Sequence, residues 1–289
     1  MRWLIEHETL LAFPEPVREH QVELRLCPRG GRLQQVAELA IATDPAAPLR
    51  EHVDCFGNRV HRLSLAAPHR ELRVQLRARV ETRLENPFAF EALRPEDERA
   101  WLAQHLHREP RLHEFRLHRS AAVPELASAA AGLEVPGRDE RRTLLENVQA
   151  LMEWTAERFA YHPGATDVHA PLSVFLEKRA GVCQDFAHWI VAVVRSWGLP
   201  ARYASGYVDP GSAPETAGEG ATHAWAEVLV PGAGWRGFDA THGLVANDRY
   251  VVAAVGRDSR DAAPVRGAFK GEHAGDAPRV RLRVARDEQ

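Results

Sequence analysis

The sequence predicts an α+β fold with a strand-rich first part and a second part in which helices precede an antiparallel sheet. Between residues 72 and 80, apolar and polar residues alternate, which is typical of a strand with one buried face. From Leu144 to Trp154, apolar residues recur at helical spacing instead. After Pro200 the strand pattern returns. Helices followed by an antiparallel sheet are characteristic of α+β domains.

Composition narrows the class of protein. The chain has 289 residues, a 45% hydrophobic and 27% charged composition, and a formal net charge of -3. These values fit a soluble globular protein and give no reason to expect nucleic acid or an anionic membrane as a partner. No apolar run approaches the roughly 20 residues that span a bilayer, and no secretion signal is visible. Three cysteines without such a signal predict reduced thiols and a cytoplasmic location.

The order of the patterns predicts three segments. Several short strands separated by turn signals predict a sandwich-like β-domain over residues 1–84. Residues 85–137 are partly helical and interrupted by prolines, which predicts a packed connector. Residues 138–289 are predicted to form the catalytic domain. There we expect helices over 139–160, after Pro171 and over 183–197, then strands over 202–208, 223–230, 235–239, 249–255 and 280–284.

Cys183 is the residue that points most directly to a chemistry. It lies where the helix over 183–197 is expected to begin, and unpaired backbone N–H groups at a helix start favour a thiolate. His223 and Asp239 follow in the strands downstream. A thiol, an imidazole and a carboxylate can serve as nucleophile, base and orienting group. The three residues therefore predict a cysteine acyl-transfer enzyme.

The same residues also have simpler explanations. A buried cysteine is usually a small hydrophobic residue, and we interpret Cys27 and Cys55 in that way. Cys183, His223 and Asp239 could also bind zinc with water as the fourth ligand. A zinc-thiolate site normally adds a second Cys or His, so this alternative is disfavoured, and no metal or cofactor is expected.

Four segments together resemble a known family. They read Gly-Val-Cys-Gln-Asp-Phe-Ala-His over 181–188, Pro-Ala-Arg-Tyr-Ala-Ser-Gly-Tyr over 200–207, His-Ala-Trp-Ala-Glu-Val over 223–228 and Gly-Trp-Arg-Gly-Phe-Asp over 234–239. They look like the bacterial transglutaminase-like family, a branch of the papain-related cysteine peptidase and transglutaminase superfamily. Residues 24–28 and 54–58 resemble its β-rich N-terminal region, and 255–258 resemble its C-terminal segment, so the likeness covers nearly the whole chain.

The resemblance implies a fold and a catalytic role for each of three residues. It implies a core in which the nucleophile cysteine begins a helix packed on an antiparallel sheet. Cys183 would be the nucleophile, His223 the general base and then acid, and Asp239 the orienting carboxylate. The family usually has Pro after this Asp, whereas Ala240 stands here, a change that removes no catalytic group.

Supporting roles are predicted for four further residues. The backbone N–H of Cys183 is a natural oxyanion donor, with Tyr161 or Gln184 as candidates for a second donor. Trp225, two residues after His223 on the same strand face, is expected to form a pocket wall. His188 is expected to make a structural hydrogen bond. The Gly- and Ala-rich loop over 210–221 is the candidate rim or lid of the site.

The expected function is attack of a thiol on a peptide or protein amide, which forms an acyl-enzyme and releases an amine. Transfer of the acyl group to water would make the protein a cysteine peptidase or amidase, the reading we favour. Transfer to an amine acceptor would make it a protein-glutamine transglutaminase. A non-catalytic peptide-binding module is the alternative from another class.

Overall fold

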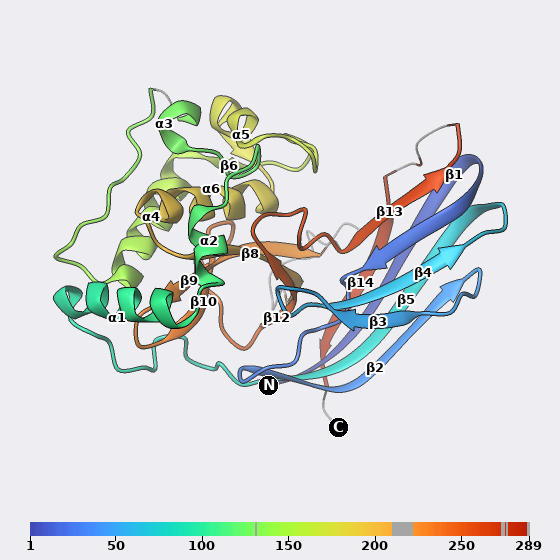
Figure 1. Ribbon diagram of the computed structural model, residues 1–289, viewed down its shortest axis with the longest axis horizontal. Coiled ribbons are helices and arrows are strands. Elements are labelled where there is room, and N and C mark those ends of the chain that lie inside the picture. The colour runs from blue at the N-terminus through green and yellow to red at the C-terminus, as the bar shows by residue number, and fades with distance from the viewer. Residues whose placement is uncertain (131, 210–221, 273–274, 276, 288–289) are drawn as a thin grey trace.

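A strand-rich layer and a helix-covered sheet stand side by side in the computed structural model (Figure 1). The structure describes residues 1–130, 132–209, 222–272, 275 and 277–287. Among these residues, no helix combines the length and the apolar composition needed to cross a membrane. The fold is mixed and strand-rich, as the sequence predicts.

Seven of the described strands form the first layer. They are β1 (Arg2–Leu24), β2 (Gln34–Asp44), β3 (Arg50–Val53), β4 (Arg59–Leu65), β5 (His69–Thr82), β13 (Val265–Lys270) and β14 (Arg279–Arg286). On β5 the alternation works as predicted, because Leu72, Val74 and Val80 are at most 2% exposed while polar residues lie between them. Burial of one face explains why this segment forms a strand.

The long strand β1 takes part in two groups of strands, which gives the strand-rich part a sandwich-like form. Its first half pairs with β5 and β14, and its second half pairs with β4 and β13. The pairing with β5 is interrupted between Ala12 and Val17, where Pro14 and Pro16 supply no N–H to a ladder. Side chains from both halves, such as Ile5 and Leu24, share one buried core.

The pairing of β13 and β14 corrects the predicted extent of the catalytic domain. The sequence pattern predicts one domain over 138–289, but residues 265–286 provide two strands that pair with β1 of the first layer. Alternation along 280–284 identifies a strand without identifying its partner, because any half-buried strand produces the same pattern. The boundaries near 84 and 137 stay predictions.

Six described helices belong to the second part. They are α1 (Pro95–Arg108), α2 (Leu112–Leu117), α3 (Leu126–Ala129), α4 (Leu144–Arg158), α5 (Leu172–Lys178) and α6 (Cys183–Ser196). The predicted helices before Ala160, after Pro171 and from Cys183 correspond to α4, α5 and α6. Thr143 caps α4 by accepting a hydrogen bond from the Glu146 N–H, while the Glu146 carboxylate accepts from the Thr143 N–H.

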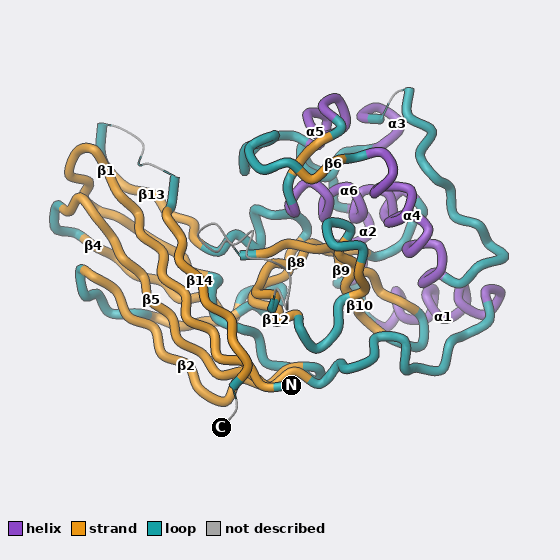
Figure 2. Tube along the Cα trace, turned by 180° about the vertical axis from the view of Figure 1, so that it is seen from behind, coloured by secondary structure: helices purple, strands orange, loops and turns teal. Residues whose placement is uncertain are grey.

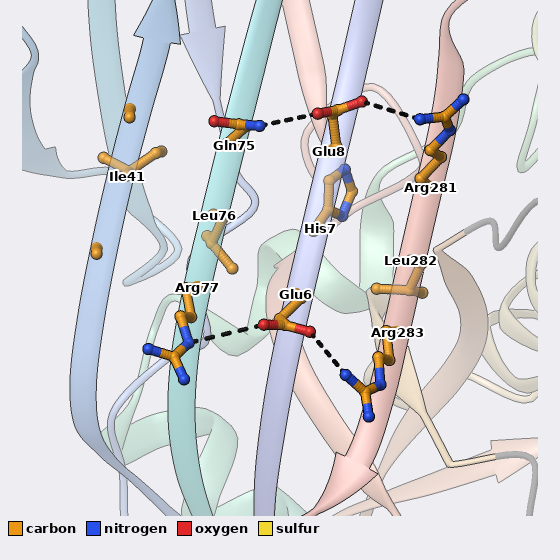
Figure 3. A pocket seen from close by; sticks show the side chains of 12 residues that line it. Glu6, His7, Glu8, Ile41, Gln75, Leu76, Arg77, Arg281, Leu282 and Arg283 are labelled. Carbon is orange, nitrogen blue, oxygen red and sulfur yellow. Dashed lines mark hydrogen bonds and ion pairs between the residues drawn. The ribbon is translucent and has the colours of Figure 1, made fainter.

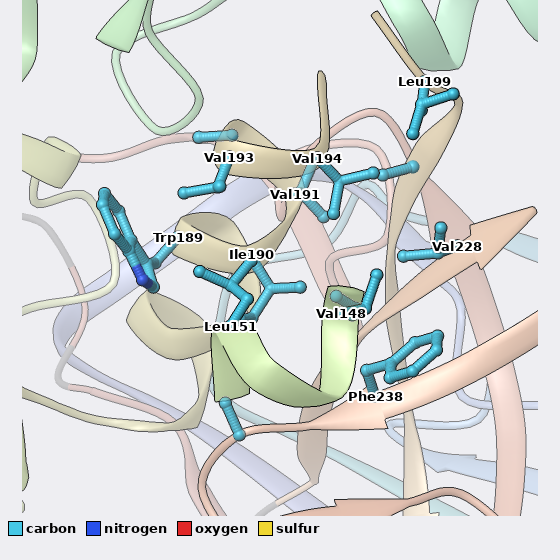
Figure 4. Close-up of a cluster of buried hydrophobic side chains, with 14 of the residues drawn as sticks. Val148, Leu151, Trp189, Ile190, Val191, Val193, Val194, Leu199, Val228 and Phe238 are labelled. Atoms are coloured by element: carbon cyan, nitrogen blue, oxygen red, sulfur yellow. The ribbon is translucent and has the colours of Figure 1, made fainter. Parts of the chain in front are cut away.

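The second sheet is antiparallel, in the order β11-β10-β9-β8-β12. Its strands are β8 (Ala201–Val208), β9 (His223–Val230), β10 (Gly234–Asp239), β11 (Leu244–Val245) and β12 (Tyr250–Gly256). Helix α6 lies against it, with Ile190 and Val194 in the same buried cluster as Val228 and Phe238 (Figure 4). The parallel pair β6 (Ala160–Tyr161) and β7 (Ala180–Gly181) leads into α6.

The first layer packs on β8 and β12 of this sheet, as the view from behind shows (Figure 2). Tyr207 and Val251 belong to the same hydrophobic core as Trp3. The fully buried Asn58 amide donates to the Val255 carbonyl at 2.7 Å and accepts from the Val255 N–H at 2.8 Å. This reciprocal pair fixes β12, the strand that carries Tyr250, against the first layer.

Candidate active site

The start of α6 holds the Cys183 thiol at the surface of the core. The helix begins at Cys183, directly after β7, and its first N–H groups lack intrahelical partners. The buried Asp185 carboxylate accepts from the Val182 N–H at 2.8 Å and from the Thr166 hydroxyl at 2.5 Å. A Cβ on Gly181 would lie 2.6 Å from that carboxylate, so only glycine fits here. These contacts fix the turn that presents Cys183.

The sheet brings His223 and Asp239 together. His223 is the first residue of β9, Asp239 is the last residue of β10, and the two strands are antiparallel neighbours. His223 Nε2 donates to Asp239 Oδ2 at 2.7 Å. This bond leaves Nδ1 as the ring nitrogen available to the Cys183 thiol. The Cys183 side chain also hydrogen-bonds the His223 ring, so all three predicted catalytic residues meet at one place, although more than fifty residues separate Cys183 from Asp239.

The Asp239 carboxylate accepts hydrogen bonds from several neighbouring groups. Its side chain is 1% exposed, and Oδ2 also accepts from Tyr250 Oη at 2.8 Å and from His242 Nδ1 at 2.7 Å. Its Oδ1 accepts from the Thr241 N–H at 3.0 Å. Burial by itself favours the neutral acid, but the hydrogen bonds from His223 and His242 outweigh it. The pKa of Asp239 therefore lies below its usual range.

The ionised Asp239 carboxylate raises the pKa of the neighbouring His223 ring. Burial is the largest single influence on this ring and favours its neutral form. The hydrogen bonds to Asp239 and Cys183 together outweigh burial and raise the pKa of His223 to about 10. At neutral pH the ring is thus an imidazolium, the charge state that pairs with a thiolate and can donate a proton.

Sequence reasoning did not identify His242 and Tyr250. The His242 ring lies 4.8 Å from the His223 ring, centroid to centroid, and its side chain is 49% exposed. Tyr250 lies at the start of β12. The position of His242 three residues after Asp239 was the available signal for this residue. No sequence pattern pointed to Tyr250, because its contact with Asp239 depends on where β12 lies in the folded chain.

Trp225 occupies the predicted position beside the imidazole. The ring is 1% exposed, and its centroid lies 6.2 Å from the His223 ring with 26° between their planes. It meets Tyr250 edge to face at 5.3 Å. A Cβ on Gly237 would lie 2.9 Å from Trp225 Nε1, so glycine at 237 makes room for the indole. Trp225 therefore forms a wall behind His223.

The two candidates for a second oxyanion donor differ in their surroundings. Tyr161 lies on β6 opposite Gly181 and is 52% exposed. Partial burial raises the pKa of the Tyr161 hydroxyl, and the nearby Cys183 and Asp239 raise it further. The Gln184 side chain instead donates to the Val168 carbonyl at 3.0 Å. The Gln184 amide is thus already engaged, and Tyr161 stays the predicted second donor.

His188 makes the structural hydrogen bond predicted for it. The ring is 2% exposed, and its Nε2 accepts from the Ser259 N–H at 3.1 Å. Burial lowers the pKa of His188 to about 4, so the ring stays neutral. The predicted rim over 210–221 lies outside the described residues.

Comparisons with known proteins identify the family. The profile of the transglutaminase-like superfamily matches residues 133–240, and that of the bacterial transglutaminase-like N-terminal region matches residues 4–81. An uncharacterized protein of Mycobacterium leprae is 33% identical over 280 residues, covering 95% of each chain. One of Mycobacterium tuberculosis is 30% identical over 283 residues, covering 92% of this chain and 87% of its own.

A protein-glutamine gamma-glutamyltransferase of Pseudomonas aeruginosa is 29% identical over 115 residues, which cover 36% of this chain and 17% of that protein. Among solved structures, a "putative cysteine protease" of Cytophaga hutchinsonii superposes with a TM-score of 0.72 at 22% identity, covering 100% of this chain and 92% of that one. At this identity the likeness shows the fold alone. The matched profiles and the relatives aligned along nearly the whole chain show that this protein belongs to the bacterial transglutaminase-like family.

Proposed function

We propose that this protein is a thiol-dependent amide hydrolase, a cysteine peptidase or amidase, that works through Cys183, His223 and Asp239. The observation that carries the proposal is the buried Asp239 carboxylate, which accepts several hydrogen bonds, one of them from His223. This contact raises the pKa of His223. A carboxylate held in this way favours the imidazolium, and an imidazolium stabilises a neighbouring thiolate. The family to which the chain belongs supports the same class of chemistry.

The geometry supports a two-step reaction. The Cys183 thiolate attacks the amide carbonyl carbon, and charge develops on the carbonyl oxygen near the first N–H groups of α6. His223 then donates its proton to the leaving amine, the C–N bond breaks, and a thioester remains on Cys183. In the second step His223 takes a proton from water, whose oxygen attacks the thioester and releases the acid and the thiolate.

Transfer of the acyl group to an amine is the second candidate. The partial likeness to the Pseudomonas aeruginosa gamma-glutamyltransferase favours it, because that protein's name describes transfer to an acceptor other than water. Both reactions share the first step and differ in what attacks the thioester. The active-site residues described above serve either acceptor equally well.

Competition between acceptors tests the proposal. Purified protein is incubated with a library of peptide and glutamine-containing substrates, with and without a primary amine, and the products are identified by mass spectrometry. Acid products that persist in excess amine would support hydrolysis. Amine adducts as the main product would replace hydrolysis with acyl transfer. Peptide binding without either product, in a protein whose Cys183 does not react with an alkylating agent, would support the peptide-binding module.

A further inference from the structure

Two histidines, His223 and His242, contact the same carboxylate oxygen of Asp239. His223 Nε2 and His242 Nδ1 each lie 2.7 Å from Asp239 Oδ2, and the three atoms all lie within 4.8 Å of one another. Two imidazole nitrogens and one carboxylate oxygen are a donor set that zinc prefers in proteins. Cys183, His223 and Asp239 lack the second Cys or His that a zinc site normally has, and His242 supplies that ligand.

The present distances are those of hydrogen bonds, and a metal would require a small expansion. Ligand atoms around a tetrahedral zinc ion lie about 3.3 Å apart, so each nitrogen would withdraw by about 0.6 Å. His242 follows the end of β10, and its half-exposed side chain can move and leaves a route from solvent. Asp239 stays in place because the Thr241 N–H holds Oδ1 and the Tyr250 hydroxyl holds Oδ2.

We propose that His223, Asp239 and His242 form a binding site for a single zinc ion, with water as the fourth ligand. The ion takes the place of the proton that His223 Nε2 donates to Asp239, and the displaced protons pass to solvent. The other nitrogen of His223 stays directed at Cys183, so the thiol is not a ligand. Zinc and the catalytic hydrogen bond thereby exclude each other.

This exclusion has a consequence that rests on the proposed function. A metal-bound His223 is no longer hydrogen-bonded to Asp239 and no longer carries the proton that the leaving amine needs. Zinc is therefore expected to be a reversible inhibitor, and removal of zinc by a chelator is expected to restore activity. The binding itself does not depend on catalysis and can be measured in a chain without the nucleophile.

The test is a zinc titration of the full chain carrying Cys183→Ala, without a polyhistidine tag, in competition with a chromophoric chelator. We expect one zinc ion per chain. Adding His242→Asn should weaken zinc binding at least about ten-fold, the loss typical when the surroundings of a metal site are altered. Asn can still donate a hydrogen bond to Asp239 but is a poor zinc ligand, so a purely structural role of His242 would leave the zinc affinity unchanged.

The matched control is His107→Asn, which removes an exposed histidine of α1 and should leave zinc affinity unchanged. If His242→Asn lowers the melting temperature more than this control does, His242→Gln takes its place. Equal zinc affinity with and without His242 would overturn the proposal. So would zinc binding that is present in the wild-type chain and absent from Cys183→Ala, because the thiolate would then be a ligand.

A second measurement separates this inference from the proposed function. Alkylation of Cys183 by iodoacetamide is followed in the wild-type chain with and without zinc. Slow alkylation without zinc would count against the catalytic proposal, while the chelator titration would still decide the zinc site. Fast alkylation together with unaltered zinc affinity in His242→Asn would keep the catalytic proposal and reject the zinc site.

Discussion

In the part of the chain that the structure describes, two groups of Cys, His and carboxylate side chains lie in contact, and their surroundings differ. The Cys183 array consists of Cys183, His223 and Asp239. The Cys27 array consists of Cys27, His61 and Glu51 in the first layer, where Cys27 Sγ lies 3.4 Å from His61 Nδ1 and His61 Nε2 lies 3.2 Å from Glu51 Oε2. On β3 and β4, Glu51 and His61 stand directly opposite each other. The same three kinds of group therefore occur in the same order of contact.

Burial is distributed in opposite ways in the two arrays. Cys27 is fully buried, and burial raises the pKa of its thiol to about 12. The Glu51 side chain is 42% exposed, and burial of His61 lowers the pKa of that ring despite Glu51. In the Cys183 array the carboxylate is buried and the thiol is partly exposed. A shielded carboxylate charges the imidazole, whereas a shielded thiol stays neutral and unreactive.

The largest expected effect is on turnover. Cys183→Ala should lower turnover by a factor approaching about 10⁶, the loss seen when a nucleophile is removed from a catalytic unit. Cys27→Ala should leave the rate unchanged and lower the free energy of unfolding by about 1 kcal/mol, the usual cost of a buried substitution. Rates measured on the best substrate from the screen, together with denaturant unfolding, check both expectations. Undiminished turnover in Cys183→Ala would reject the mechanism.

The next effect is on thiol reactivity. At pH 7 a thiol with a pKa of about 12 is ionised in only about one molecule in 10⁵, so Cys27 should resist iodoacetamide in the folded chain. Cys183 should react at least about 10³-fold faster. His223→Ala should slow Cys183 without making it as inert as Cys27, because an ordinary exposed thiol is still ionised in about one molecule in thirty at pH 7. Site-by-site mass spectrometry measures both rates. Equal alkylation rates for Cys27 and Cys183 would contradict the expected difference in thiol reactivity between the two arrays.

A smaller loss is expected when the carboxylates are neutralised. Asp239→Asn should lower the rate by about 10²- to 10³-fold, less than for a serine enzyme because a thiolate is intrinsically nucleophilic. The matched change Glu51→Gln should leave the rate unchanged. Steady-state kinetics of the two variants provide the comparison, and a comparable loss in Glu51→Gln would show that the Cys27 array also contributes.

The pH profile should report the raised pKa of His223. The protonated ring is needed to release the amine, so kcat/KM should fall about ten-fold per pH unit as the pH rises through about 10. His61 provides a contrast, because its lowered pKa leaves that ring neutral at pH 7. Circular dichroism at each pH verifies that the chain stays folded. A basic limb close to pH 7 would contradict the strong coupling between His223 and Asp239.

The smallest effect is expected from the donors around Asp239. Tyr250→Phe removes one hydrogen bond to Oδ2 and should lower the rate by about 2- to 10-fold, which corresponds to the net value of one such bond. The control is Tyr207→Phe, which removes a buried hydroxyl bonded to the Leu26 carbonyl in the interface with the first layer. A rate that falls equally in both variants would point to lost stability rather than to Asp239.

Much of the fold was predictable because it depends on local pattern. Alternation identified β5, apolar spacing identified α4, and the position of Cys183 at a helix start agreed with α6. The segment Gly-Trp-Arg-Gly-Phe-Asp over 234–239 identified Asp239 as the candidate catalytic carboxylate. These features depend on neighbours in the chain, and spacing along the chain records them directly.

Local sequence pattern predicted β5, β8, β9, the helices α4 and α6, and the candidate residues Cys183, His223 and Asp239. The pairing of β13 and β14 with the first layer, and the contacts of His242 and Tyr250 with Asp239 Oδ2, emerge only from the three-dimensional fold. The charge state of a side chain depends on its burial and on its hydrogen-bond partners. Both arise from segments far apart in the chain, which no local pattern brings together.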